Sequence, residues 1–389
     1  MNRNDVETKY LDLCRAQIKQ LDTDCMQCLF RNMRGCYPLT VQYLADQLKI
    51  RHVACSLHSV NDIWSVPLLA RPFPHIVDGD WRYCTSTTAS LIDFAHRNIG
   101  RSAACLHLGS PSTYKTALTA FPETGLHHLH DRNYILHGAR AVEDKGNHYD
   151  VAFLDPPWYE NETYMFLEIA ARRLASSGLA LVAQPSTLTR PGVVEERSQI
   201  IDRAKMLGFN LVQHFEDYLR YEIPHFEYVT LKQTVDYPVP ADWRTGDLLV
   251  FSLDAPSASI KKNTSQVSDE YNWREVSLGP VRLKFREIGE LPPFSPLESN
   301  CMMNSVSRRD VAVKKAGIWS SGNRIYSCNN SSLTLSIVSR LNCLLRRCEL
   351  RESTIVEILV GTGLKPHLAF VSARAIVDDV MEHMQHAWI

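Results

Sequence analysis

The residues with the clearest chemical potential are Asp155-Pro156-Pro157-Trp158, which follow the apolar segment 151–154. That segment has the composition of a strand buried on both faces of a sheet. Two successive prolines hold the backbone extended and remove two N–H donors, so carbonyl oxygens stay exposed beside one carboxylate. Converging acceptors of this kind bind an amino group and aim its lone pair, while the indole offers a flat stacking surface. The tetrapeptide therefore predicts a site that orients an amine.

Two further polar segments follow predicted strands upstream. Gly109, Ser110 and Pro111 come after one short apolar run, and Asp131 comes after the next. Glycine lets the backbone approach a ligand closely, and the following helix N-terminus presents free N–H groups. A carboxylate about 20 residues further on is well placed to accept the ribose hydroxyls of an adenosine cofactor. Open α/β sheets bind ligands beyond the carboxyl ends of their strands, so these segments predict a cofactor site.

A parallel sheet with crossover helices is needed to bring these residues together. Strands alternate with helices over 81–235, which predicts a Rossmann-like, seven-stranded α/β sheet that ends in an antiparallel hairpin around Pro224. The predicted strands are 103–108, 125–130, 134–138, 149–154, 178–183, 210–218 and 226–233, and the predicted helices are 85–98, 114–120, 164–176 and 194–207.

Two regions flank the predicted sheet. Residues 1–80 read as a helical module, either a winged-helix-like unit or a plain helical cap on the sheet. Residues 236–389 read as a mixed α/β region for substrate or partner recognition, with strands at 243–251 and 273–286 and helices at 333–349 and 367–386. The domain prediction is therefore 1–80, 81–235 and 236–389.

From Trp81 to Gln233 the chain resembles the class I S-adenosylmethionine-dependent methyltransferases that carry an (Asp/Asn)-Pro-Pro-aromatic motif. It is most similar to the probable N6-adenine methyltransferase group, which includes ribosomal RNA adenine and protein-lysine methyltransferases. The residues that carry the resemblance are Trp81-Arg82-Tyr83-Cys84-Thr85, Leu108-Gly109-Ser110-Pro111-Ser112, Asp131-Arg132 and the DPPW motif. The first loop lacks the Gly-x-Gly pattern, which leaves the cofactor contacts less well defined than the amine site.

The resemblance and the residues together predict three sets of site residues. The catalytic set is Asp155, Pro156, Pro157 and Trp158; the set that binds S-adenosylmethionine is Tyr83, Thr85, Gly109, Ser110, Pro111, Asp131 and Arg132. The substrate rim is Tyr159, Tyr221 and Glu222, because aromatic and acidic side chains there could hold a base or a lysine. A plain hairpin connection around Tyr221 is the structural alternative.

The predicted reaction is transfer of a methyl group to an amino nitrogen. The favoured substrate is adenine N6 of nucleic acid, and the second choices are protein lysine or a small amine. Aminopropyl transfer, as in the branched-polyamine synthases, ranks second because the loop 109–112 has no acidic residue for a cationic substrate. A non-catalytic scaffold subunit is the third reading. Only about 45 residues separate this loop from the DPPW motif, so no recognition domain fits between them. Substrate selection is therefore expected from the flanking regions or from a partner, either nucleic acid or protein.

Whole-chain composition limits the partners. The 389 residues carry a formal net charge of −1, so no global field favours nucleic acid or an anionic membrane. The dense basic stretch 319–324, flanked by Arg308, Arg309, Lys314 and Lys315, is either a phosphate contact or a solvated loop. No apolar run reaches the ~20 residues of a bilayer span, and the N-terminus lacks a signal-peptide core, so a cytoplasmic protein with no membrane association is expected.

The cysteines near the N-terminus and the histidines within 127–130 are not predicted to bind metal. Cys25 and Cys28 have a Cys-x-x-Cys spacing, and Cys36 could add a third thiolate, but the segment reads as helical and no second Cys-x-x-Cys follows. Free core thiols are the favoured interpretation. The histidines within 127–130 are interpreted as strand and loop residues beside the cofactor rather than as ligands, because strand neighbours point to opposite faces.

Overall fold

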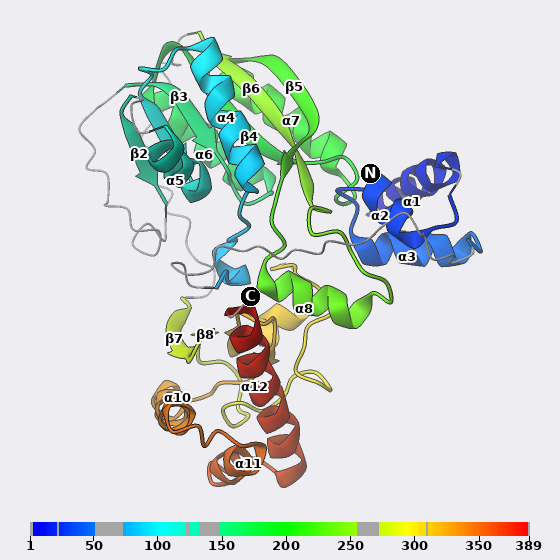
Figure 1. The fold of residues 1–389 in the computed structure, drawn as a ribbon, viewed down its shortest axis with the longest axis vertical. Coiled ribbons are helices and arrows are strands. Elements are labelled where there is room, and N and C mark those ends of the chain that lie inside the picture. The colour runs from blue at the N-terminus through cyan, green and yellow to red at the C-terminus, as the bar shows by residue number, and fades with distance from the viewer. Residues whose placement is uncertain are drawn as a thin grey trace. The chain divides into compact units, whose positions relative to one another are not determined.

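The computed structural model describes residues 3–21, 23–50, 73–121, 125–131, 148–254, 272–308 and 310–387. The chain forms two compact units, each assembled from separate segments (Figure 1). The first contains Met1–Asp62, Trp81–Ile223 and Tyr237–Thr264; the second contains Ile63–Asp80, Pro224–Asp236 and Ser265–Ile389. The segment just before the predicted sheet region 81–235 and the last residues of that region thus belong to the second unit.

The first unit has a mixed sheet of six strands within the described residues, in the order β2-β1-β3-β4-β6-β5. Its strands are β1 (Cys105–Leu108), β2 (His127–His130), β3 (Tyr149–Leu154), β4 (Leu174–Pro185), β5 (Phe209–Arg220) and β6 (Thr245–Leu253). Strands β2, β1, β3 and β4 are parallel, and β6 runs antiparallel to both β4 and β5. The predicted parallel α/β sheet is therefore present. The expected strand 134–138 lies outside the described residues.

The predicted closing hairpin is wrong. Residues expected as the strand 226–233 form the helix α8 (His225–Thr234), with Pro224 directly before its first turn. The antiparallel strand is instead β6, expected in the C-terminal region, and it lies inside the sheet between β4 and β5. Nearly every residue of β6 is buried, as an internal strand requires. A short apolar run fits a buried helix or a buried strand equally well, and here strand pairing decided between them.

Four helices cover the two faces of this sheet: α4 (Thr85–Asn98), α5 (Pro111–Ala120), α6 (Glu160–Arg173) and α7 (Val193–Met206). Side chains alternate along β3, so Ala152 and Leu154 join one hydrophobic cluster while Val151 and Phe153 join the other. The first cluster contains residues of α6 and α7, and the second contains residues of α4 and α5. The sheet is therefore a central layer with helices on both sides.

Three N-terminal helices pack within the first unit: α1 (Arg3–Gln20), α2 (Met26–Asn32) and α3 (Pro38–Gln47). The hydroxyl of Tyr10 donates to the carbonyl of Leu188 at 3.0 Å, and the Gly35 amide donates to the carbonyl of Trp243 at 2.8 Å. These bonds tie the helices to loops of the sheet region. Any wing of a winged helix would fall in 51–72, outside the described residues.

The second unit contains an antiparallel sheet in the order β10-β9-β8-β7, together with the helices α8 to α12. Its remaining elements are β7 (Arg274–Leu278), β8 (Val281–Phe285), β9 (Ile318–Ser320), β10 (Ile325–Tyr326), η1 (Ile76–Asp78), α9 (Val311–Lys315), α10 (Ser331–Arg346), α11 (Glu352–Val360) and α12 (Pro366–Ala387). The single strand expected at 273–286 is a hairpin, turned at Gly279 with φ +56°. Among the described helices, none is both long and apolar enough to span a lipid bilayer.

The basic stretch 319–324 is neither a phosphate contact nor a solvated loop. All six of its residues are buried. The Arg324 side chain is 3% exposed and forms ion pairs with Asp379 at 3.1 Å and Glu382 at 3.0 Å. From the sequence, Arg324 was expected either to contact phosphate or to be solvated. In the structure, two carboxylates of α12 neutralise its charge.

Candidate functional site

The register of the parallel strands brings the first loop, the end of β2 and the DPPW motif to one edge of the sheet. Leu108 ends β1, and the parallel pairing aligns it with the last residue of β2 and with the last residue of β3. Gly109, Asp131 and Asp155 are the next residues of the three strands, so they leave the sheet side by side. The Gly109 amide donates to the carbonyl of His130 at 2.9 Å, and the Asp155 amide donates to that of Leu108 at 3.0 Å. The predicted convergence of these segments is therefore present.

Gly109 has a conformation and surroundings that exclude a side chain. Its φ is +59°, in the left-handed region. A Cβ atom there would lie 2.8 Å from Cε1 of Phe166 and 3.0 Å from the carbonyl oxygen of Asp155. The loop thus runs close against the DPPW motif, and Ser110 and Pro111 then begin α5. A close backbone approach at a helix N-terminus, with Asp131 at the neighbouring strand end, fits a nucleoside cofactor.

Asp155 is held by a neutral donor. The hydroxyl of Tyr221 donates to Oδ1 of Asp155 at 3.0 Å. Tyr83 pairs with Tyr221 through a backbone bridge, and the two ring centroids lie 4.6 Å apart. Burial, followed by the charge of Asp155, raises the pKa of both phenols well above the ordinary range, so both hydroxyls stay protonated. The structure thus places one residue predicted to bind cofactor and one predicted on the rim together beneath the carboxylate.

Trp158 is fixed in place from several directions. Its ring meets that of Tyr221 edge-on, with centroids 5.2 Å apart. A Cβ atom on Gly246 would lie 3.0 Å from Cζ2 of Trp158, so only glycine leaves room for the indole. The Trp158 carbonyl accepts a hydrogen bond of 2.9 Å from Arg190, which Glu196 holds by an ion pair of 2.6 Å. Sequence reasoning missed these supports because they come from other strands and loops.

Arg244 lies among three tryptophan rings, and it too was missed. Its guanidinium carbon is 4.8 Å from the ring centroid of Trp243, 5.1 Å from that of Trp81 and 5.6 Å from that of Trp158. The residue is 9% exposed, and its carbonyl accepts the amide of Tyr221 at 3.1 Å. The run Trp-Arg-Thr-Gly at 243–246 was a usable signal, but it was assigned to the C-terminal region.

The remaining predicted site residues occupy less central places. Thr85 is exposed at the first position of α4, and Tyr159 directly precedes α6. Glu222 follows the bridge made by Tyr221, and its amide donates to a carbonyl at position 82 at 2.8 Å. Arg132 lies outside the described residues.

A chain of hydrogen bonds supports the first loop from behind. Oγ of Ser110 lies 2.7 Å from Oγ1 of Thr113, which lies 2.7 Å from Nδ1 of His107. The other ring nitrogen of His107 is 3.1 Å from His127. Burial lowers the pKa of His107 well below its ordinary value, so this ring is neutral. Both ring nitrogens of His107 are therefore used in this support of the loop.

The cysteine motif does not gather into a metal site within the described residues. Cys36 instead has its sulfur 3.9 Å from that of Cys14. Among those residues, the group whose geometry could hold a metal ion is His225, Asp379 and His383 in the second unit, which sequence reasoning did not anticipate. Asp379 is ion-paired with Arg324, however, and Nε2 of His383 lies 2.7 Å from Oγ of a buried serine at 321. These two groups belong to an internal polar network.

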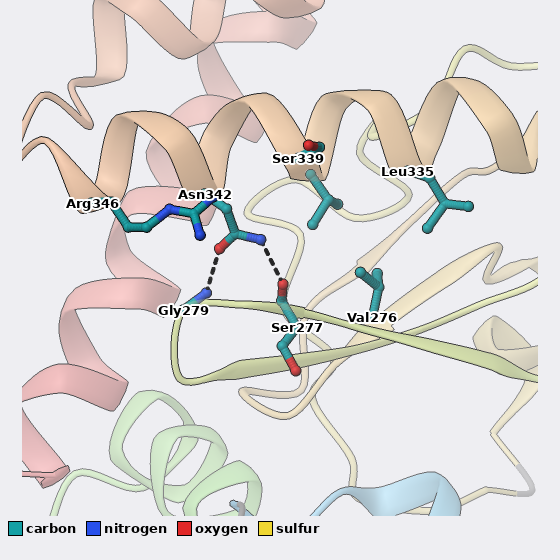
Figure 2. Close-up of a pocket in the computed structure, with 8 residues that line it drawn as sticks. Val276, Ser277, Gly279, Leu335, Ser339, Asn342 and Arg346 are labelled. Atoms are coloured by element: carbon teal, nitrogen blue, oxygen red, sulfur yellow. Dashed lines mark hydrogen bonds between the residues drawn. The ribbon is translucent and has the colours of Figure 1, made fainter.

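A cavity of about 460 Å³ in the second unit lies between the β7–β8 hairpin and α10 (Figure 2). Asn342 accepts from the Gly279 amide at 2.9 Å and donates to the Ser277 carbonyl at 2.8 Å. Among the residues that line it, Arg346 is the one ionisable side chain. The lining therefore carries a single formal charge.

No family model and no curated protein matches the sequence. Solved structures with a similar chain path include the C9 mutein of a branched-chain polyamine synthase from Thermus thermophilus in complex with N4-aminopropylspermidine and 5'-methylthioadenosine, at 11% identity, a TM-score of 0.41, and coverage of 66% of this chain and 96% of that one. A methyltransferase from Pyrococcus furiosus matches at 15% identity and a TM-score of 0.28, over 43% of this chain and 83% of that one. TrmN from Thermus thermophilus matches at 13% identity and a TM-score of 0.25, over 43% of this chain and 52% of that one. Likeness at this level defines neither a family nor a reaction.

Proposed function

We propose that the first unit transfers a methyl group from S-adenosylmethionine to an amino nitrogen, with adenine N6 of nucleic acid as the lead substrate. The observation that carries this proposal is the strand register, which sets Gly109, Asp131 and the DPPW motif at adjacent strand ends. A cofactor cradle and an amine-orienting motif thus share one edge of a parallel sheet, where such sheets bind ligands.

The cofactor-binding role falls to the first loop and to the end of β2. Gly109 allows close approach, the N-terminus of α5 after Ser110 presents N–H groups, and Asp131 is placed to accept ribose hydroxyls. When bound, S-adenosylmethionine supplies an electrophilic methyl carbon on a sulfonium.

The amine-orienting role falls to the DPPW motif. The carboxylate of Asp155 and the carbonyl of Pro156 accept the two N–H bonds of the amine, which leaves its lone pair directed at the methyl carbon. The nitrogen would gain the methyl group as the C–S bond breaks and its electron pair stays on sulfur, and the surplus proton on nitrogen would pass to the Asp155 carboxylate and from there to water. Tyr221 keeps Asp155 in position through its hydroxyl, and Trp158 offers its face to a planar substrate. The contribution of these residues is chiefly orientation and proximity.

A transfer assay tests the function. Protein is incubated with S-adenosylmethionine tritiated in the methyl group and with RNA, single-stranded DNA, protein or spermidine, and the acceptor is counted. We expect label in the nucleic acid at adenine. A parallel reaction with decarboxylated S-adenosylmethionine labelled in the propyl chain detects aminopropyl transfer to spermidine. Label only in that arm would replace the proposal with the polyamine reading, and no cofactor binding by calorimetry would favour a scaffold.

A further inference from the structure

The C-terminal half of α10 and the segment that follows it carry a group of exposed arginines. The members of this arginine patch are Arg340, Arg346, Arg347 and Arg351, and all four are exposed. Arg340 and Arg347 are seven residues apart, so they lie on one side of the helix, about two turns from each other. Arg351 comes four residues later, directly before α11. The four side chains therefore share one stretch of surface in the second unit.

The fold does not balance the charge of the arginine patch. None of its guanidinium groups forms an ion pair or a side-chain hydrogen bond with another residue that the structure describes. Helix α10 contains no acidic residue, and Glu287, at its opposite end, accepts the amide of Ser331 at 2.8 Å. The acids within the segment of the patch are Glu349 and Glu352, so four cations stand against two anions there. The segment keeps an excess of positive charge.

The opposite wall of the neighbouring cavity does not supply the missing anions. The β7–β8 hairpin contains one acid, Glu275, which forms ion pairs with Arg282 at 2.7 Å and with Lys284 at 3.1 Å. Arg346 lies at this cavity beside Asn342 of the same helix (Figure 2). The other lining residues are apolar or carry hydroxyl and amide groups. The arginine patch thus borders a surface that is uncharged apart from Arg346 itself.

We propose that the arginine patch, together with the cavity beside it, binds the phosphate backbone of a nucleic acid. This inference deepens the proposed function and rests on it for the class of substrate. A guanidinium group pairs with phosphate oxygens through two parallel hydrogen bonds, and all four cations of the patch are arginines. Among the described residues that line the cavity none is aromatic, so a base has no ring there on which to stack. Affinity therefore comes mainly from phosphate, and it depends on salt rather than on base sequence.

Binding measurements test the inference without requiring turnover. The full chain is titrated against a fluorescently labelled oligoadenylate over a range of salt concentrations, and anisotropy reports the bound fraction. The test variant is Arg340→Gln/Arg347→Gln. The matched control is Arg101→Gln/Arg374→Gln, which changes the net charge equally by removing two other exposed arginines, one before β1 and one on α12.

The test variant should bind about 10-fold more weakly than the wild type, and the control should stay within about twofold. For single strands, each phosphate contact contributes about −0.7 to the slope of log affinity against log salt concentration. Loss of two contacts should therefore make the slope shallower by about 1.4, whereas the control should keep the slope of the wild type. Arg340→Lys/Arg347→Lys retains both charges and should also keep that slope.

An equal loss of affinity in the test and control variants would overturn the inference, because net charge alone would explain it. Wild-type protein that binds polyglutamate or phosphatidylserine vesicles as tightly as oligoadenylate would overturn it in favour of an acidic protein or a membrane. A duplex of the same length, titrated in parallel, shows whether the preferred backbone is single-stranded or paired, and loss of binding to either one in the test variant supports the inference. If the separate transfer assay labels no adenine while the patch still binds oligoadenylate, the proposed function fails and the binding surface stands.

Discussion

Asp155 in the first unit and Asp379 in the second are carboxylates with very different partners. Asp379 lies 3.1 Å from the guanidinium of Arg324, and both side chains are nearly inaccessible. Asp155 receives the hydroxyl of Tyr221, a neutral donor. A buried ion pair within the unit serves the fold, whereas Asp155 directly follows β3 at the strand ends, where open α/β sheets bind their ligands. Of the two, Asp155 is therefore the group suited to chemistry.

The second unit repeats this internal balance elsewhere. Asp78 lies 2.6 Å from Arg282 and 2.7 Å from Lys284, and Glu275 joins the same cluster at 2.7 Å from Arg282. Burial opposes ionisation of Asp78, but the charges of Lys284 and Arg282 hold the pKa of its carboxyl below the ordinary value. The comparison predicts that substitutions at the strand ends of the first unit change activity, while those at the buried ion pairs of the second change stability.

Asp155→Ala should give the largest effect. Without the carboxylate the amine is no longer oriented, so methyl transfer should fall by roughly 1,000-fold or more. Cofactor affinity measured by calorimetry should stay within about threefold, because the loop at Gly109 is intact. Asp202→Ala, an exposed position on α7, is the matched control and should behave as wild type. Near-normal transfer by Asp155→Ala would refute the mechanism.

Asp379→Ala should be costly in stability. It leaves Arg324 buried with one remaining partner, so the free energy of unfolding should drop by about 3–5 kcal/mol. Urea denaturation measures the loss. Asp378→Ala removes a neighbouring, exposed carboxylate and should change stability by less than about 0.5 kcal/mol. Equal losses in the two variants would show that the buried pair contributes nothing specific.

His75 should make the second unit sensitive to acid. Burial lowers the pKa of His75 to about 4 from the ordinary 6.5. Between those pH values the unfolded chain binds a proton that the folded one does not, so stability falls as pH falls, by up to about 3 kcal/mol. Unfolding curves at pH 7 and pH 5 for the wild type and His75→Gln isolate this contribution from that of the carboxylates. The variant should show the shallower slope, and identical slopes would contradict the prediction.

Tyr221→Phe should lower methyl transfer by roughly 10- to 100-fold, since a hydrogen bond to a charged group is worth about 1.5–3 kcal/mol. The loss should appear in kcat, with cofactor affinity unchanged, because the ring and its packing remain. Tyr43→Phe removes an exposed hydroxyl that binds only a side chain of its own helix, and it should have no effect. A loss confined to cofactor affinity would place Tyr221 in cofactor binding instead.

Gly109→Ala should have the smallest effect. A positive φ costs a non-glycine residue about 1–2 kcal/mol, and the new Cβ would press on Phe166 and on the Asp155 carbonyl. Cofactor binding should weaken by about 10-fold in calorimetry. Gly289 has a similar φ of +76°, and a Cβ atom there would meet nothing. Gly289→Ala should therefore lower stability through backbone strain and leave cofactor binding unchanged. Equal binding in both variants would remove Gly109 from the cofactor site.

Local patterns predicted much of the first unit. The helix 85–98 and the strand 149–154 coincide with α4 and β3, because each has a clear period and punctuation at its ends. The segment 226–233 was misassigned because its apolar residues satisfy a helix and a strand alike. Strand β6 was assigned to the wrong region, since nothing in its own residues states that it inserts between β4 and β5.

The sequence by itself determined which atoms are available: a carboxylate and exposed carbonyls after a buried strand, and a glycine loop and an acid after two others. Those are properties of residues adjacent in the chain. Only the tertiary structure decided that Tyr221, 66 positions from Asp155, donates to it, and that Arg244 lies over Trp158. Tyr221 directly follows β5 and Arg244 directly precedes β6, two strands that pair antiparallel, and such long-range register depends on packing across the whole sheet rather than on local preference.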